Sequence, residues 1–194
     1  MKPFWKGSGS LPDPSRTRAW KASEAHGGSN TERREGLDAR SFRKVMARFP
    51  TGVTVVTARA GEGAPMGLTV SAFTSVSLDP PLVLVCIDRG SDSHGGIVSA
   101  GSFAVNVLSS AQEAVARRFA SDPAAGRFDQ VAWRDGPGGA PILDGVAAWL
   151  SCAVEATHPG GDHTLVIGRV QAADVGSGEA LAFYRGAFGA VTAE

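Results

Sequence analysis

Polar and apolar positions alternate along residues 67–78 with the two-residue period of a β-strand. One parity carries hydroxyls and the other carries apolar side chains: Thr69, Ser71, Ser75 and Ser77 against Leu68, Val70, Val76 and Leu78. No Lys or Glu stands on the hydroxyl parity, although such residues are usual where a strand meets water. The pattern favours a polar wall that hydrogen-bonds a flat ligand, while a Ser- and Thr-rich strand taken alone is more often a solvated sheet face.

Further strands follow from shorter apolar runs. Pro80 and Pro81 end the hydroxyl-bearing segment because proline cannot donate to a sheet ladder, and LVLVCI at residues 82–87 reads as a strand buried on both faces. Residues 52–60 and 103–108 have strand composition. The C-terminal third predicts three or four strands, separated by glycine-containing turns at residues 159–161, 176–178 and 185–186.

Two helices are expected. Asp38 is placed to cap a helix that ends before Pro50, and its apolar side chains recur at helical spacing and are predicted to be core: Phe42, Val45, Met46 and Phe49. Ser110 and Glu113 have the spacing of a capping box and open a helix that includes Phe119. Many short strands with few helices, and no regular alternation of the two, predict a mainly β barrel or sandwich.

Composition divides the 194 residues into two parts. The first 36 residues are rich in Gly, Ser, Pro, Lys and Arg and lack apolar periodicity, so we expect a disordered or loosely attached extension without a secretory signal. Residues 37–194 are predicted to form one domain.

The charge and the cysteine content limit the classes of partner and the cellular compartment that we expect. Nineteen basic residues balance nineteen acidic ones, which gives no sign of nucleic-acid binding, and no apolar run is long enough to span a membrane. Cys86 and Cys152 lie in apolar runs, and we expect buried reduced thiols in a cytoplasmic protein, a disulfide being the less favoured alternative. His158, Asp162 and His163 are separated by a Pro-Gly-Gly turn, and we predict no metal site there.

The common nucleotide-binding fingerprints do not occur. The chain has neither a GxGxxG motif nor a Walker phosphate loop. A phosphate-bearing cofactor would therefore be held by hydroxyls, backbone N–H groups and an arginine.

Several motifs in order resemble the flavin reductase-like family, the FMN-binding split barrels that serve as reductase components of two-component monooxygenases. The resemblance spans roughly residues 38–192 and rests on these segments: FRKVMARFPTGVTVVTA from Phe42, GLTVSAFTSVSLDPPLVLVCID from Gly67, GSFAVNVLS from Gly101, RRFAS from Arg117, RFDQVAW from Arg127, GDHTLVIGRV from Gly161 and FYRGAFG from Phe183. It implies a split β-barrel with peripheral helices, usually a homodimer.

The resemblance also implies which residues bind FMN or FAD. The positions expected to contact the flavin and its phosphate are Thr69, Val70, Ser71, Ala72, Phe73, Thr74, Asp88, Arg89, Ser91, Ser93, His94 and Arg127. Phe183, Tyr184, Arg185 and Gly186 are expected on the nicotinamide nucleotide side, where an aromatic ring beside an arginine can stack on a base and meet a pyrophosphate. Phe188 stands where many family members have tyrosine.

His163 is the candidate catalytic residue, because the family carries this histidine near the nicotinamide. A neutral imidazole there could hydrogen-bond the carboxamide or assist proton movement, whereas a turn histidine bonded to backbone is the commoner arrangement.

The resulting hypothesis is an NAD(P)H:flavin oxidoreductase that supplies reduced flavin to a separate monooxygenase. Two alternatives stay open: a protein that holds FMN tightly and acts on an organic substrate or an electron-transfer partner, and a flavin-binding module without catalysis. Nothing in the residues chooses between NADH and NADPH, or between FMN and FAD.

Overall fold

The computed structural model describes residues 38–59 and 63–191, which belong to one unit, Leu37–Glu194. The prediction for residues 1–36 lies outside the described residues.

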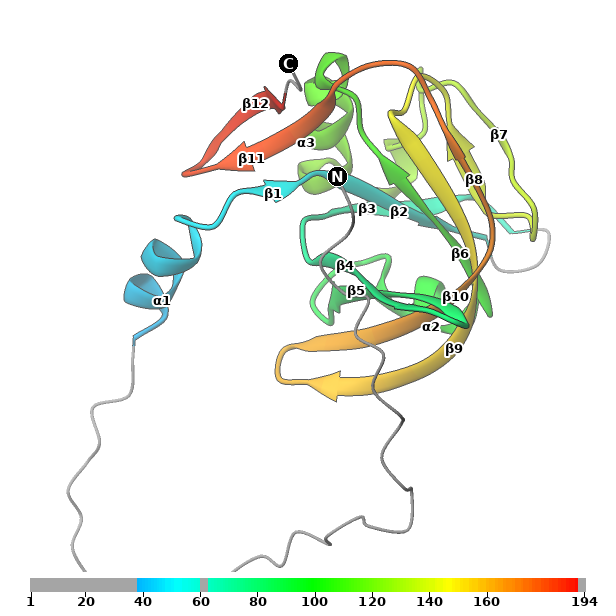
Figure 1. Ribbon diagram of the computed structural model, residues 1–194, viewed down its shortest axis with the longest axis horizontal. Coiled ribbons are helices and arrows are strands. Elements are labelled where there is room, and N and C mark those ends of the chain that lie inside the picture. The colour runs from blue at the N-terminus through cyan, green and yellow to red at the C-terminus, as the bar shows by residue number, and fades with distance from the viewer. Residues whose placement is uncertain (1–37, 60–62, 192–194) are drawn as a thin grey trace, which may run out of the picture. The chain divides into compact units, whose positions relative to one another are not determined.

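Strands dominate this unit, as predicted (Figure 1). The strands are β1 (Thr51–Gly52), β2 (Thr54–Ala58), β3 (Met66–Val70), β4 (Phe73–Leu78), β5 (Pro81–Asp88), β6 (Ser102–Val107), β7 (Trp133–Asp135), β8 (Pro141–Leu143), β9 (Ala148–Gly160), β10 (His163–Val175), β11 (Ala180–Tyr184) and β12 (Ala187–Val191). The helices are α1 (Ala39–Met46), α2 (His94–Ser99) and α3 (Glu113–Ser121), with short 3₁₀ turns at Ser110–Gln112 and Ala124–Gly126.

Seven strands form the main sheet in the order β3-β2-β6-β9-β10-β5-β4. All pairings in this sheet are antiparallel, and β9 and β10 curve together as a long hairpin (Figure 1). The edge strands β3 and β4 are consecutive in the chain, and no ladder in the described residues joins them. The mainly β, barrel-like fold class predicted from the sequence is therefore confirmed, as a sheet that is not closed by hydrogen bonds. Two small sheets accompany it, β1-β11-β12 and β7-β8.

The alternating segment at residues 67–78 is not one strand. It divides at Ser71 and Ala72, because Val70 pairs with Thr54 on β2 whereas Phe73 pairs with Val85 on β5. The two-residue period is interrupted there, since Phe73 stands on the hydroxyl parity and Thr74 on the apolar parity, but the interruption does not reveal which strand lies alongside.

Apolar burial occurs in two main clusters. One lies inside the main sheet around Val56, Val85 and Phe103, and the other lies where α3 covers the sheet, around Leu108 and Phe119. Trp133 packs edge-on to Phe128, and Trp149 packs against the core, so both tryptophans have packing roles.

Helix α1 has the predicted cap but not the predicted burial. The Asp38 carboxylate accepts hydrogen bonds from the backbone N–H groups of Arg40 and Ser41, at 2.8 and 2.9 Å. The apolar stripe remains exposed at 53, 64, 49 and 66% for Phe42, Val45, Met46 and Phe49, so its assignment to the core was wrong. Helical spacing identifies an apolar face without specifying what covers it.

Two smaller expectations also need correction. The capping box is formed by Ser109 and Gln112, not by Ser110 and Glu113 as predicted. It begins a 3₁₀ turn that precedes α3. On β5 only one face is buried, because Leu82, Leu84 and Cys86 are half-buried while Val83, Val85 and Ile87 belong to the core.

Among the described helices, none has the length and apolar character needed to cross a membrane.

A buried amide joins three strands of the fold. Asn106 on β6 donates to the carbonyl of Val55 on β2 at 3.1 Å, and its Oδ1 accepts from the Leu143 N–H of β8 at 2.8 Å. Replacing Asn106 with Ala leaves the buried Leu143 N–H without its partner and removes the side-chain bond to the Val55 carbonyl, so we expect the free energy of unfolding to fall by about 3 kcal/mol in urea titration.

Ser102→Ala is the matched control on the same strand. Its exposed hydroxyl donates to the Gly138 carbonyl at 3.0 Å, and we expect a loss below about 1 kcal/mol. A loss of similar size in both variants would contradict the role assigned to Asn106.

Candidate functional site

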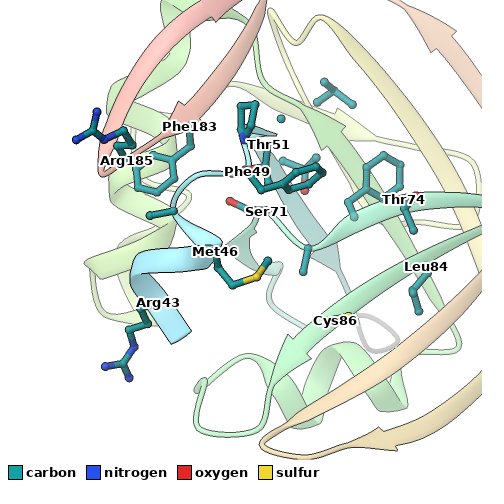
Figure 2. A pocket seen from close by; sticks show the side chains of 17 residues that line it. Arg43, Met46, Phe49, Thr51, Ser71, Thr74, Leu84, Cys86, Phe183 and Arg185 are labelled. Atoms are coloured by element: carbon teal, nitrogen blue, oxygen red, sulfur yellow. The ribbon is translucent and has the colours of Figure 1, made fainter. Parts of the chain in front are cut away.

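A cavity of about 870 Å³ lies over the link between β3 and β4 (Figure 2). Six of the predicted site residues line it: Ser71, Ala72, Phe73, Thr74, Phe183 and Arg185. The volume falls within the range of about 300–1,000 Å³ that is common for small-molecule sites. The structure therefore brings residues 71–74 together with Phe183 and Arg185, which lie far away in the sequence.

The cavity also has walls that the sequence reasoning missed. β5 contributes Leu84 and Cys86, and α1 contributes Arg43 and Met46, with Phe49 just beyond its end. Figure 2 shows Met46 and Phe49 close to Ser71, whereas Arg43 and Arg185 point outward on the same side of the cavity. The available signals were the apolar second face of β5 and the α1 stripe, both of which had been assigned to the core.

The walls of this apolar cavity suit a flat ring system. Phe49, Phe73 and Phe183 supply aromatic surface, and Leu84 and Cys86 supply further apolar surface. Side chains with hydroxyl groups line the cavity at only a few positions, such as Ser71 and Thr74. Backbone around Ser71 and Ala72 lies at the sheet edge, where it can hydrogen-bond the rim of a planar ligand.

A second, polar cavity of about 490 Å³ lies further along the same two strands. It is lined by Leu68, Thr69, Asp88, Gly90, Ser91, Asp92, Phe119, Ala120 and Arg127. β3 runs from Thr69 in the polar cavity to the Ser71 link in the apolar one, and β5 runs from Cys86 in the apolar cavity to Asp88 in the polar one. The two cavities are therefore successive along one pair of strands.

Arg127 occupies the wall of the polar cavity with its charge already paired. Its guanidinium donates to the carbonyls of Gly67 and Asp122, both at 2.9 Å, and to Ser93 Oγ at 3.0 Å. Asp92 Oδ1 lies 2.9 Å from Arg127 Nη1. The predicted phosphate-binding arginine is thus a buried group held by protein acceptors on several sides.

Six further positions predicted to bind the flavin or the nucleotide fall outside both linings. Val70 and Ser93 are buried, and the Ser93 hydroxyl donates to the Gly67 carbonyl at 3.2 Å. His94 begins α2, and its Nε2 lies 2.8 Å from Thr164 Oγ1. Arg89, Tyr184 and Gly186 line neither cavity. Flavin contact by Val70, Arg89, Ser93 and His94, and nucleotide contact by Tyr184 and Gly186, stay predictions.

The loop after β5 is tied to the turn that carries His163. The Arg89 N–H donates to the Asp162 carbonyl at 3.0 Å, and His163 pairs with Asp88 in the β10–β5 register. His163 Nδ1 lies 2.7 Å from Asp162 Oδ1, and this hydrogen bond lowers the pKa of the Asp162 carboxyl, with a smaller contribution from the positive charge of Arg43. His163 lines neither cavity, and its catalytic role stays a prediction.

The residues present fit a flavin. A flavin combines a flat, largely apolar ring system with a polar chain that ends in phosphate. The apolar cavity matches the first part, and the adjoining polar cavity, with Thr69, Ser91 and Arg127, matches the second. Fold and site together define a barrel-like β protein built to hold a flat, phosphate-bearing cofactor.

Comparison with known proteins agrees with this geometry. Residues 46–192 match the flavin reductase like domain. A probable flavin reductase of Rhizobium meliloti is 46% identical over 154 residues, covering 79% of this chain and 49% of its own length. The reductase subunit of a flavin-dependent monooxygenase from Rhodococcus jostii is 40% identical, covering 79% of this chain and 78% of its own length.

A solved structure shows the same likeness. The NADH:FAD oxidoreductase of Streptomyces globisporus, in complex with NAD and FAD fragments, superposes with a TM-score of 0.75 at 41% identity, covering 80% of this chain and 93% of that chain. The chain therefore belongs to the flavin reductase like domain family. It spans about half the length of the Rhizobium relative.

Cys86 provides a chemical probe of the apolar cavity. Burial raises the pKa of the Cys86 thiol, so less of the reactive thiolate is present at neutral pH than in an ordinary cysteine. We expect iodoacetamide to alkylate Cys86 more slowly than free cysteine, with a rate that rises as the pH increases beyond the usual thiol pKa, measured by mass spectrometry.

Cys86→Ser is the control for this labelling, because the remaining thiol, Cys152, is buried with its pKa raised to about 12. This variant should take up no label in the folded state. Alkylation of Cys86 as fast as that of free cysteine would contradict its position in the cavity wall.

Proposed function

We propose that this protein is an NAD(P)H:flavin oxidoreductase that reduces FMN or FAD and supplies reduced flavin to a separate monooxygenase. The observation that carries the proposal is that an apolar cavity and a polar cavity follow one another along β3 and β5. The family membership of the chain, and the reductase subunit among its relatives, support the same activity.

Each part of the flavin has a place in this proposal. The ring system lies in the apolar cavity against residues 71–74, and the phosphate-bearing chain extends toward Thr69, Ser91 and Arg127. When bound, the flavin supplies the acceptor for the hydride of the dihydronicotinamide. The protein contributes the apolar walls that exclude water and hold two flat rings together, since hydride transfer depends mainly on their positioning.

The nicotinamide nucleotide enters from the side that carries Arg43 and Arg185. Both line the apolar cavity, and neither forms an ion pair with another residue of the described ranges. The Arg185 N–H donates to the Ala47 carbonyl at 3.2 Å, which ties the β11–β12 turn to the end of α1. We assign the phosphates of NADH or NADPH to these two guanidinium groups and the nicotinamide to the space beside Phe183.

His163 acts at the edge of this arrangement. Its hydrogen bond to Asp162 orients the ring, and its position beside Asp88 brings it close to the loop that follows β5. In the proposal His163 hydrogen-bonds the nicotinamide carboxamide and improves positioning without being an obligatory acid or base.

The central experiment mixes purified protein, NADH or NADPH, and free FMN, FAD or riboflavin, and follows the loss of nicotinamide absorbance. We expect at least one flavin to accelerate nicotinamide oxidation. Replacing both Arg43 and Arg185 with Ala should raise the KM for the nucleotide tenfold or more with little change in kcat, because each charge-assisted hydrogen bond contributes about 1.5–3 kcal/mol.

A phosphate-free dihydronicotinamide, such as the N-benzyl compound, is the matched control substrate. The double variant should use it as well as the unmodified protein does. No flavin-dependent oxidation by the unmodified protein would reject the function, whereas equal losses with both substrates would reject only the assignment of the two arginines.

We also infer that the protein is a homodimer. The exposed α1 stripe and the exposed Val76 and Leu78 of edge strand β4 present apolar surface that a second copy of the chain would cover. A cytoplasmic location stays a prediction, for which the support is that both cysteines carry free thiols.

Light scattering after gel filtration tests the dimer. Phe42→Glu combined with Val45→Glu places charges on the stripe at positions outside the cavity lining, and we expect it to convert the dimer to a monomer. Val175→Glu is the control, because Val175 is 82% exposed at the end of β10, and it should remain dimeric. A monomeric unmodified protein would contradict the inference.

A further inference from the structure

Asp92 lines the polar cavity beside Arg127. Its carboxylate meets Arg127 through two contacts, Oδ1 at 2.9 Å from Nη1 and Oδ2 at 3.3 Å from Nη2. A phosphate group binds arginine through the same paired geometry. We propose that Asp92 competes with the flavin phosphate for Arg127 and thereby keeps the affinity for flavin low. This inference rests on the proposed function.

The charges of the polar cavity support competition. Asp88 and Asp92 contribute two carboxylates to its wall, and Arg127 contributes one guanidinium. A phosphate that entered while both carboxylates stayed in place would meet a net negative surface. If the Asp92 carboxylate moves away as the phosphate arrives, the balance of charge around Arg127 is preserved.

The geometry indicates that Asp92 is the partner able to move. The Arg127 side chain is 8% exposed, and its other acceptors are two backbone carbonyls and the buried Ser93 hydroxyl. The Asp92 side chain is 48% exposed and lies in the loop between β5 and α2. Its further contacts are long, 3.3 Å from the Ala124 N–H and 3.5 Å from Ser93 Oγ. The carboxylate can therefore exchange Arg127 for water.

Such an exchange makes the phosphate contribute little to net affinity. Each new bond from Arg127 to phosphate replaces an existing bond from Arg127 to Asp92, so the gain is largely offset by the loss. A flavin bound in this way is held mainly by its ring system. It leaves readily after reduction, as a flavin delivered to another protein must.

The unmodified protein gives the first test, by titration of flavin fluorescence without any nicotinamide. FMN and riboflavin share the ring system and differ in the phosphate. We expect their dissociation constants to agree within about threefold, since the phosphate replaces an existing partner of Arg127. FMN binding tenfold or more tighter than riboflavin would overturn the proposal.

Asp92→Asn gives the second test. It removes the competing charge and keeps an oxygen that can accept from the guanidinium. We expect FMN to bind about tenfold tighter in this variant, with the affinity for riboflavin unchanged, because a charge-assisted hydrogen bond to phosphate is about twice as strong as a neutral one. Asp92→Ser, a second variant without the charge, should behave in the same way.

Asp122→Asn is the matched control. The Asp122 carbonyl also accepts from Arg127, at 2.9 Å, but no ion pair joins its carboxylate to Arg127. Removal of this charge should leave the affinity for FMN unchanged. Equal tightening of FMN and riboflavin in Asp92→Asn, or an unchanged affinity for FMN, would overturn the competition. The oxidation of NADH by the unmodified protein tests the proposed function separately, because the titrations contain no nicotinamide.

Discussion

The position of the site depends on the change of hydrogen-bonding partner between Val70 and Phe73. β3 pairs with β2 and β4 pairs with β5, at opposite edges of one seven-stranded sheet. The short link at Ser71 and Ala72 connects the two edges along the chain, and the Ala72 carbonyl accepts from the Cys86 N–H at 3.0 Å. Because no ladder closes the sheet at this point, side chains from both edges face a shared space. The apolar cavity and its polar continuation follow from that gap.

The arginines near the two cavities differ in whether their charge is already paired with a protein carboxylate. Arg127 is buried and bonded to protein acceptors, as a buried guanidinium must be to offset the cost of desolvation. Arg43 and Arg185 line the apolar cavity and point outward from it, without an ion-pair partner among the described residues. A ligand anion gains a new partner at Arg43 and Arg185, whereas at Arg127 it exchanges one anion for another. The same residue type therefore contributes differently to affinity on the two sides.

Local patterns predicted much of the strand content, but not the features that depend on distant partners. The four C-terminal strands and the Asp38 cap followed from turn residues and spacing. The division of the segment at Ser71 could not be predicted, because the alternation of side chains does not reveal which strand lies alongside. Ser109 with Gln112 and Ser110 with Glu113 both fit a capping box, and only the fold selects the first pair. The resemblance placed Arg127 near the site, but Asp92 lies 35 residues away in sequence, so their pairing had no local signature.

The helix that completes the cavity wall contributes no buried side chain of its own. Met46 on α1 and Phe49 just beyond it face the cavity while remaining 49 and 66% exposed, and α1 is connected to the β11–β12 turn through the bond from Arg185 to Ala47. Elements with little buried apolar surface are displaced at low free-energy cost. Within a single copy of the chain, the α1 side of the cavity is thus easily displaced, whereas the β5 side is anchored in the core through Val85 and Ile87. A cavity with one rigid wall and one movable wall can hold ligands of different sizes without a change in the sheet.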